Sequence, residues 1–295
     1  MNEIVRSIDE GYEIIREIGR GSVGVVYACR PSMGSNSDVA IKIMSPSPML
    51  DTAVFDGIIN AAMATRSLPD NAAVVRVLSA GKTPSGHYYI TMELVEGGTL
   101  ERFIGEENLD FQGKLRLAAG IAKALGHIHS AGITHGDLKP PNILISSDGK
   151  PLLNDFYLVP RLGAAATGAS SMGTPYYMSP EQAEGRPVSP ASDIYSFGVL
   201  LYELLTGKTP YSAETNNLSE MIEAVSKGKI ESLGKHCRKA TPKLDALMSR
   251  LLSKEPETRP RHGAEVATTL LEISEETNPQ SVLEKLKGLF ARRKT

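Results

Sequence analysis

The segment HGDLKPPN, residues 135–142, carries the strongest signal in this chain, because it sets an acid, a base and an amide within six positions. An apolar strand candidate, Ile143 to Ile145, follows it directly. Thirteen residues past Asn142 comes Asp155, again after an apolar run. Two acids and an amide at two strand ends are what a pair of hard cations bound between phosphates requires. The pattern therefore predicts a site that handles phosphates and metal ions.

A glycine-rich turn and a lysine nearer the N-terminus extend this pattern. The sequence GRGSVG places Gly19, Gly21 and Gly24 between two strand candidates. Glycines are expected at any hairpin turn, but they also let backbone N–H groups approach phosphate oxygens. A strand on both sides disfavours a dinucleotide-binding fold, in which a helix follows the glycines. Further on, VAIK places Lys42 in an apolar strand; its side chain either points to solvent or binds phosphate, and its spacing from the glycines favours phosphate.

The remaining periodicity divides the chain into a strand-rich first third and a helical remainder. Short runs rich in Ile, Val and Tyr predict strands at residues 12–19, 23–29, 38–44, 74–79 and 87–94. Between them, apolar residues at helical spacing from Phe55 to Met63 predict one helix, which Pro69 ends. After Gly97-Gly98, helical patterns cover residues 111–131, 191–205, 218–225, 243–252 and 264–273. We therefore predict an α+β fold of two lobes, a small β-rich one with one helix and a larger helical one.

Composition excludes several other classes of protein. The 295 residues carry a net charge of −2, so no basic field favours nucleic acid. Cys29 and Cys237 lie far apart without metal-type spacing, which predicts reduced thiols. No apolar stretch reaches the roughly 18 residues of a membrane span. We expect a cytoplasmic protein without a transmembrane segment.

Together these motifs resemble the protein kinase family over residues 12–273. The stretch GTPYYMSPE, residues 173–181, is similar to the family's substrate-binding segment, and DIYSFG, residues 193–198, to the start of its central helix. EQAEG and ELLTG, which begin at Glu181 and Glu203, are most like bacterial members of the serine/threonine type. The resemblance implies a kinase domain over residues 10–275, with an N-lobe at 10–93, a hinge at 93–98, a C-lobe at 99–275 and a tail at 276–295.

The resemblance implies transfer of the γ-phosphate of ATP to serine or threonine hydroxyls of proteins, with Mg²⁺ or Mn²⁺ as the metal. Asp137 would orient the substrate hydroxyl and Lys139 would neutralise the γ-phosphate. Asn142 and Asp155 would hold the metal. The residues implied to hold the nucleotide are Gly19, Gly21, Gly24, Val26, Ala40, Lys42, Glu93, Val95 and Leu144, with Met92 beside the adenine as gatekeeper. Glu181 and Arg259 match a structural ion pair.

Three departures from the family pattern support an alternative. The glutamate that should pair with Lys42 is replaced by Ala61, and no acid occurs from Gly57 to Pro69. Tyr157 stands where the family has a glycine, which restricts φ at that position.

The third departure is Gly136, which replaces an arginine, so a phosphate on Thr167, Ser170 or Ser171 has no obvious partner beside the catalytic loop. Two hypotheses follow from these departures. The chain is a working, slow kinase, or it is a pseudokinase that binds nucleotide and partners without turnover.

The tail falls outside the resemblance. From Val282 to Lys294 it combines an apolar stripe with five positive charges. It either packs as a short helix on its own helical lobe or binds a partner or a membrane surface.

Overall fold

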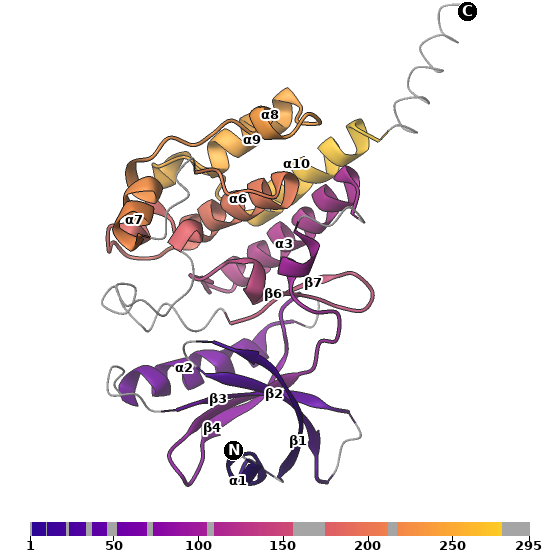
Figure 1. Ribbon diagram of the computed structural model, residues 1–295, viewed down its shortest axis with the longest axis vertical. Helices are drawn as coiled ribbons and strands as arrows, with labels where there is room; N and C mark the ends of the chain where they lie inside the picture. The colour runs from indigo at the N-terminus through magenta and orange to yellow at the C-terminus, as the bar shows by residue number, and fades with distance from the viewer. Residues whose placement is uncertain are drawn as a thin grey trace, which may run out of the picture. The chain divides into compact units, whose positions relative to one another are not determined.

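The computed structural model describes residues 2–9, 11–21, 24–33, 37–45, 52–69, 73–104, 109–155, 175–211 and 217–278. Contacts divide the chain into two compact units. The N-terminal unit comprises Met1–Gly98 with Leu144–Thr174, and the C-terminal unit Thr99–Ile143 with Pro175–Thr295. Figure 1 shows the sheet of the N-terminal unit in indigo and violet, and the helices of the C-terminal unit in magenta to yellow.

The N-terminal unit is built on an antiparallel sheet with the strand order β1-β2-β3-β5-β4. The strands are β1 (Tyr12–Arg20), β2 (Val25–Pro31), β3 (Val39–Met44), β4 (Val77–Lys82) and β5 (Tyr88–Glu93). All five predicted strands are confirmed, but the second and fourth begin two or more residues later than predicted, and the third and fifth one residue later. The second strand begins at Val25 rather than at residue 23. The fourth begins at Val77 rather than at residue 74, because Val74 forms only an isolated bridge with Leu153.

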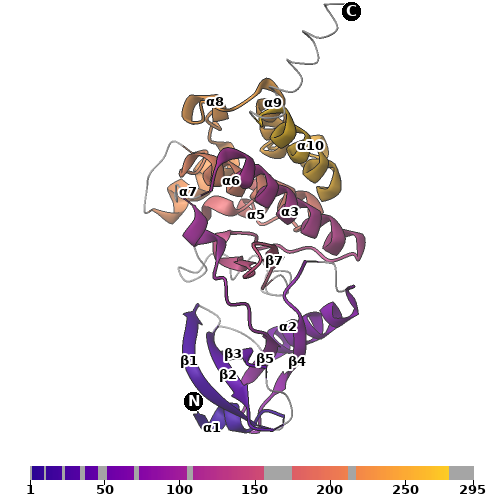
Figure 2. The ribbon, with the colours of Figure 1, turned by 90° about the vertical axis from the view of Figure 1, so that its right-hand side faces the viewer.

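Each face of this sheet packs on a helix (Figures 1 and 2). Helix α2 (Thr52–Ala64) covers one face, where its Phe55 stacks on Tyr88 with ring centroids 4.8 Å apart. The short α1 (Asn2–Arg6) lies on the other face, where Val5 and Ile8 join a separate apolar cluster. The six residues of β3 are all buried because successive side chains alternate between these two faces. Ala40 and Met44 belong to the α2 side and Val39, Ile41 and Ile43 to the α1 side, which places Lys42 on the α2 side.

The C-terminal unit is mostly helical. Its helices are α3 (Phe111–Ser130), α5 (Pro180–Ala183), α6 (Pro190–Thr206), α7 (Leu218–Lys227), α8 (Leu233–His236), α9 (Pro242–Leu251) and α10 (Gly263–Glu276). Short 3₁₀ turns lie at Leu100–Phe103 (η3), Pro140–Asn142 (η4), Pro175–Tyr177 (η5) and Pro256–Thr258 (η6). The five helices that periodicity predicts beyond Gly98 are confirmed, with ends that differ by a few residues. The four-residue helices α5 and α8 were not predicted, because one turn shows no period.

The ends of the long helices follow their capping residues. Helix α3 begins where Asp110 accepts a hydrogen bond from the N–H of Gly113, at 2.7 Å. Helix α6 ends at Gly207, whose φ of 74° is the left-handed value that glycine adopts without strain. Helix α10 packs along α3, as both views show (Figures 1 and 2). Among the residues that the structure describes, no helix is long and apolar enough to cross a membrane.

A two-stranded sheet, β6 (Ile143–Ile145) and β7 (Pro151–Leu153), connects the predicted catalytic loop to Asp155. The strand predicted after Asn142 is thereby confirmed. Because Asn142 directly precedes β6 and Asp155 follows β7 by two residues, both candidate metal ligands come from the ends of this ribbon.

Candidate active site

In the N-terminal unit, Lys42 forms a buried ion pair with Asp155. Lys42 Nζ lies 2.7 Å from Asp155 Oδ2, and their side chains are 7% and 17% exposed. The backbone at Asp155 has a φ of 60°, an uncommon value for a residue with a side chain. Removing one partner of such a pair leaves an uncompensated buried charge, so the contact fixes both side chains.

Helix α2 brings no acid to this lysine. Ala61 is partly buried and packs against the same apolar cluster as Ala40 and Met44, which flank Lys42 on its face of β3. The acid nearest in sequence, Asp56, is exposed. The expectation of a small, apolar helix face is therefore confirmed, and Asp155 is the carboxylate that pairs with Lys42 in the described part of the chain.

The residues predicted to enclose the adenine come together in one cluster of the N-terminal unit. Ala40 and Met92 are 5% and 3% exposed in this cluster, and Val26, Val95 and Leu144 pack against it as partly buried residues. The register of β3 aligns Ala40 with Met92 on β5, which explains why the two lie side by side. An apolar cluster of this kind can hold a flat ring.

Glu93, the first residue of the predicted hinge, is fixed by β4. Its N–H donates to the Arg76 carbonyl at 3.0 Å, and its carboxylate accepts from the Arg76 N–H at 2.9 Å. Further along this segment, Gly97 lies so close to the Ile145 carbonyl that a Cβ would collide with it.

The glycine turn is compact where the structure describes it. Gly21 donates its N–H to the carbonyl of Gly24 at 2.9 Å. A side chain at Gly24 would collide with the Ile43 carbonyl of β3, so this position requires glycine. Gly19 has open space around it, which is consistent with a strand end that faces a ligand.

In the C-terminal unit, the side chains of Lys139 and Asn142 both contact Asp137. Lys139 Nζ lies 2.8 Å from Asp137 Oδ2, and Asn142 Nδ2 donates to the same oxygen at 2.9 Å and to the Asp137 carbonyl at 2.8 Å. Both side chains of the ion pair remain partly exposed, at 17% for the lysine and 23% for the aspartate. An oriented carboxylate with a mobile cation beside it is suited to proton transfer and to phosphate neutralisation.

Two residues that the sequence did not single out for this role hold the loop in place. Asp193, at the start of α6, is 1% exposed and accepts hydrogen bonds from the N–H groups of His135 and Gly136, both at 2.7 Å. Gln182 donates to the Gly136 carbonyl at 2.8 Å. Gly136 itself has a φ of 76°, so glycine adopts the loop conformation at lower cost than the family's arginine would. An acid in the first turn of an otherwise apolar, buried helix is the signal that would have indicated Asp193.

The predicted pair of Glu181 and Arg259 is present and buried. Arg259 donates to both carboxylate oxygens at 2.8 and 2.9 Å, and Ser192 donates to one of them at 2.7 Å. Burial alone would raise the pKa of Glu181, but these hydrogen bonds outweigh it and lower the pKa to about 2. The contact ties the end of the predicted substrate-binding segment to the loop before α10.

The oxygens available suit a hard cation held partly by phosphate. Asp155 offers a carboxylate, and Asn142 keeps its amide oxygen because its Nδ2 is engaged with Asp137. Within the described ranges, no three His, Cys, Asp or Glu side chains cluster as a metal site. Mg²⁺ typically uses one or two protein ligands together with phosphates and water, and the carboxylate of Asp155 and the amide oxygen of Asn142 are each of the kind of ligand that this ion accepts.

Several predictions lie outside the described residues. They concern Tyr157, the activation-loop hydroxyls Thr167, Ser170 and Ser171, and the tail segment from Val282 to Lys294. The glycine-loop residues Ser22 and Val23 also lie outside these ranges.

These features together define a protein kinase domain. They are the five-stranded antiparallel sheet with one large helix, the helical unit, the glycine turn, the buried lysine and the loop of Asp137, Lys139 and Asn142. The family model described as "Protein kinase domain" matches residues 12–271, so the chain belongs to the protein kinase family. The predicted family and fold are thereby confirmed.

Curated relatives of the chain are named serine/threonine-protein kinases. The chain is 34% identical over 268 residues to the probable serine/threonine-protein kinase CA_C1728 of Clostridium acetobutylicum, covering 89% of this chain and 40% of that protein. It is 30% identical over 282 residues to the serine/threonine-protein kinase PknB of Mycolicibacterium smegmatis, covering 93% and 44%. For the serine/threonine-protein kinase PknK of Mycobacterium tuberculosis the identity is 32% over 272 residues, covering 90% and 24%. The chain thus spans less than half the length of these curated relatives.

Proposed function

We propose that the chain transfers the γ-phosphate of MgATP to serine or threonine hydroxyls of protein substrates. The observation that carries this proposal is that Lys139 and Asn142 both contact the same carboxylate oxygen, Oδ2 of Asp137. A carboxylate held by an ammonium and an amide has the chemistry that transfer of a hydroxyl proton requires, which favours the kinase over the pseudokinase hypothesis. The names of the relatives support the same activity.

Each residue has a role that follows from its chemistry. Asp137 accepts the hydrogen of the substrate hydroxyl and aligns its oxygen with the γ-phosphorus. Lys139 leaves the carboxylate to neutralise the charge on the γ-phosphate, and Lys42 binds the α- and β-phosphates. Asn142 and Asp155 would hold Mg²⁺, which would supply further charge neutralisation on the phosphates.

The nucleotide is proposed to lie against the apolar cluster of the N-terminal unit. Val26 and Ala40 would cover one face of the adenine and Leu144 the other, while the backbone of Glu93 and Val95 would bind its edge. Gly19, Gly21 and Gly24 would bring backbone N–H groups to the phosphates. We also propose that Mg²⁺ is the working metal and that Mn²⁺ can replace it. We further propose that the protein is cytoplasmic and that the kinase domain extends from residue 10 to residue 275.

The test is transfer of labelled phosphate from ATP to a generic serine- and threonine-rich substrate, with Mg²⁺ or Mn²⁺. We expect the parent chain to exceed the Asp137→Asn variant by at least a hundredfold, about 2.7 kcal/mol of transition-state stabilisation. Asp148→Asn is the matched control, because Asp148 is exposed and its partners among the described residues are its neighbours Lys150 and Ser146. Equal signals from the parent and Asp137→Asn would replace this proposal by the pseudokinase hypothesis.

A further inference from the structure

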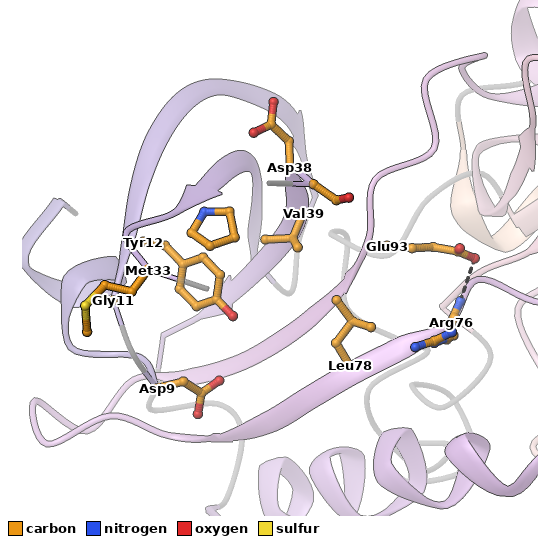
Figure 3. Close-up of a pocket in the computed structure, with 11 residues that line it drawn as sticks. Asp9, Gly11, Tyr12, Met33, Asp38, Val39, Arg76, Leu78 and Glu93 are labelled. Atoms are coloured by element: carbon orange, nitrogen blue, oxygen red, sulfur yellow. Dashed lines mark hydrogen bonds between the residues drawn. The ribbon is translucent and has the colours of Figure 1, made fainter. Parts of the chain in front are cut away.

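The N-terminal unit has a second candidate site, a pocket of about 590 Å³ that the proposed reaction does not use (Figure 3). Val39 forms part of its floor, together with Tyr12 and Leu78. These three belong to the apolar cluster on the α1 side of the sheet. The pocket therefore opens on the face opposite Ala40 and Lys42, which belong to the nucleotide side.

The lining of the pocket includes residues from all five strands of the sheet. It takes Tyr12 from β1, Pro31 from β2, Val39 from β3, Glu93 from β5 and Leu78 from β4. The register pairs Tyr12 with Pro31, and Val39 with Glu93. Five adjacent strands span about 19 Å at their usual spacing of about 4.8 Å. An extended peptide of about six residues has this length, whereas a compact metabolite does not.

Charge around the floor favours a cationic ligand. Figure 3 shows the carboxylates of Asp9, Asp38 and Glu93 around the floor, with Arg76 beside Glu93 as the cation among the lining residues. Asp38 is paired with Arg30 at 3.0 Å, so its charge is already compensated.

The other two carboxylates are bonded to neutral donors. Asp9 accepts from the hydroxyls of Ser79 and Tyr89, at 2.7 and 3.3 Å, and Glu93 accepts from the N–H of Arg76. These hydrogen bonds hold the carboxylates in place without cancelling their charge. The described lining carries three carboxylates and one guanidinium, that of Arg76, so a lysine or arginine of a ligand would complement the excess negative charge.

The rim adds an apolar contact. Met33 lines the pocket with its side chain 67% exposed, the most exposed large apolar side chain among those that the structure describes. Methionine adapts its shape to varied apolar partners, so it is suited to covering a bound side chain.

We propose that this pocket docks an extended peptide segment of a partner protein. A bulky apolar residue of that segment lies over Tyr12 and Leu78 under Met33, and basic residues on both sides of it face Asp9 and Glu93. This inference does not depend on phosphoryl transfer. Glu93 is the docking residue shared with the proposed nucleotide site, to which it would contribute its backbone, whereas its carboxylate lines the pocket. Docking would recruit the partner to the kinase domain.

The experiment measures fluorescence anisotropy of labelled hexapeptides Lys-Gly-X-X-Gly-Arg, with X as Leu, Met or Phe, titrated with the full chain in the absence of ATP. We expect saturable binding by at least one peptide of the set. Replacing both basic residues of that peptide by Glu, or both X residues by Gly, should weaken binding at least tenfold.

The variant Met33→Lys should also weaken binding at least tenfold, because it removes the apolar cover and adds a like charge. Its matched control is Leu271→Lys, since Leu271 is a half-exposed apolar residue of α10 in the other unit. Asp9→Asn, which keeps the shape of the side chain and tolerates a φ of 45°, tests the charge separately. The proposal is overturned if no peptide binds up to millimolar concentration, or if Met33→Lys and the parent bind equally well.

Discussion

At the scale of single residues, Lys42 has an ion-pair partner other than the glutamate that the family places on α2. Its ammonium pairs with Asp155 at 2.7 Å, while Ala61 packs among apolar side chains on the same face. The lysine is therefore held by the loop after β7 rather than by the helix. The position of the Lys42 side chain therefore does not depend on an ion pair with α2.

This arrangement predicts unusual kinetics for two variants. Lys42→Ala should cost less than the several orders of magnitude expected of a tightly preorganised contact. Ala61→Glu should increase phosphoryl transfer, because a carboxylate beside the cluster of Ala40 and Met44 would have Lys42 as its counter-ion. Steady-state kcat and KM measure both effects.

The control is Ala64→Glu, which adds the same charge at an exposed position three residues further along α2. Loss of a robust activity in Lys42→Ala would show that another acid positions this lysine. No gain in Ala61→Glu over Ala64→Glu would contradict our account of the helix.

Glu181 predicts a pH dependence of stability. Its folded pKa of about 2 lies below the usual value of 4.5, so it stabilises the fold fully above pH 4.5 and progressively less as the pH falls toward 2. The difference corresponds to about 3 kcal/mol. In urea unfolding at pH 7, 5, 4 and 3, Glu181→Gln should lower the free energy of unfolding at pH 7 and flatten its dependence below 4.5. Glu184→Gln, an exposed control, should change neither quantity, and equal slopes for both variants would contradict the argument.

At the scale of elements, the packing of α10 on α3 depends on glycine. A side chain at Gly263 would meet the Ala122 carbonyl and the backbone N of Gly126, neither of which can rotate away. Gly263→Ala should therefore destabilise the chain by about 1–3 kcal/mol in chemical unfolding. Gly234→Ala in α8 is the control, because its new methyl makes only ordinary contacts at 3.5 Å and longer and should be neutral or stabilising. Equal stability of the two variants would show that α10 can shift at no cost.

The catalytic loop predicts weak control by activation-loop phosphorylation. Asp193 and Gln182 hold the loop at His135 and Gly136, so no arginine is needed to order it. Thr167→Ala, Ser170→Ala and Ser171→Ala should each change kcat/KM only a few-fold. Gln182→Ala should reduce it more, because it breaks both the cap of α5 and the bond to Gly136. A hundredfold loss in any of the three alanine variants, about 2.7 kcal/mol, would mean that another cation binds the phosphate.

At the scale of the whole molecule, nucleotide binding should appear as stability. ATP should raise the melting temperature, and Mg²⁺ should increase the effect, because a ligand that binds only the native state adds about 2.7 kcal/mol at a hundredfold excess over its Kd. Differential scanning fluorimetry measures both increments. Asp155→Asn should abolish the Mg²⁺ increment, and Asp148→Asn should retain it. A melting curve unmoved by millimolar MgATP would refute the nucleotide site.

Local patterns predicted most of the fold and the core of the site. Strands and long helices could be predicted because apolar residues recur with a period of 2 or 3.6 over several residues. Asp137, Lys139 and Asn142 were readable because they lie within one loop. The start of β4 was misplaced because Val74 forms an isolated bridge with Leu153 of β7, a long-range pairing that leaves no mark in the local sequence.

Long-range contacts explain what the sequence did not reveal. Asp193 reaches Gly136 across 57 residues, and Gln182 reaches it across 46. Hydrogen bonds over such separations depend on how the elements pack and produce no periodic signal. The hydrogen bond from the backbone of Arg76 to the carboxylate of Glu93 was missed for the same reason.

The pairing of Lys42 with Asp155 has a consequence for the order in which ligands bind. The carboxylate proposed to hold Mg²⁺ already has an internal counter-ion, so a bare cation must compete with an ammonium 2.7 Å away. Phosphates that attract Lys42 would release that carboxylate to the metal. Nucleotide and metal binding would then be coupled, since Lys42 would pair with phosphate while Asp155 became available to the metal.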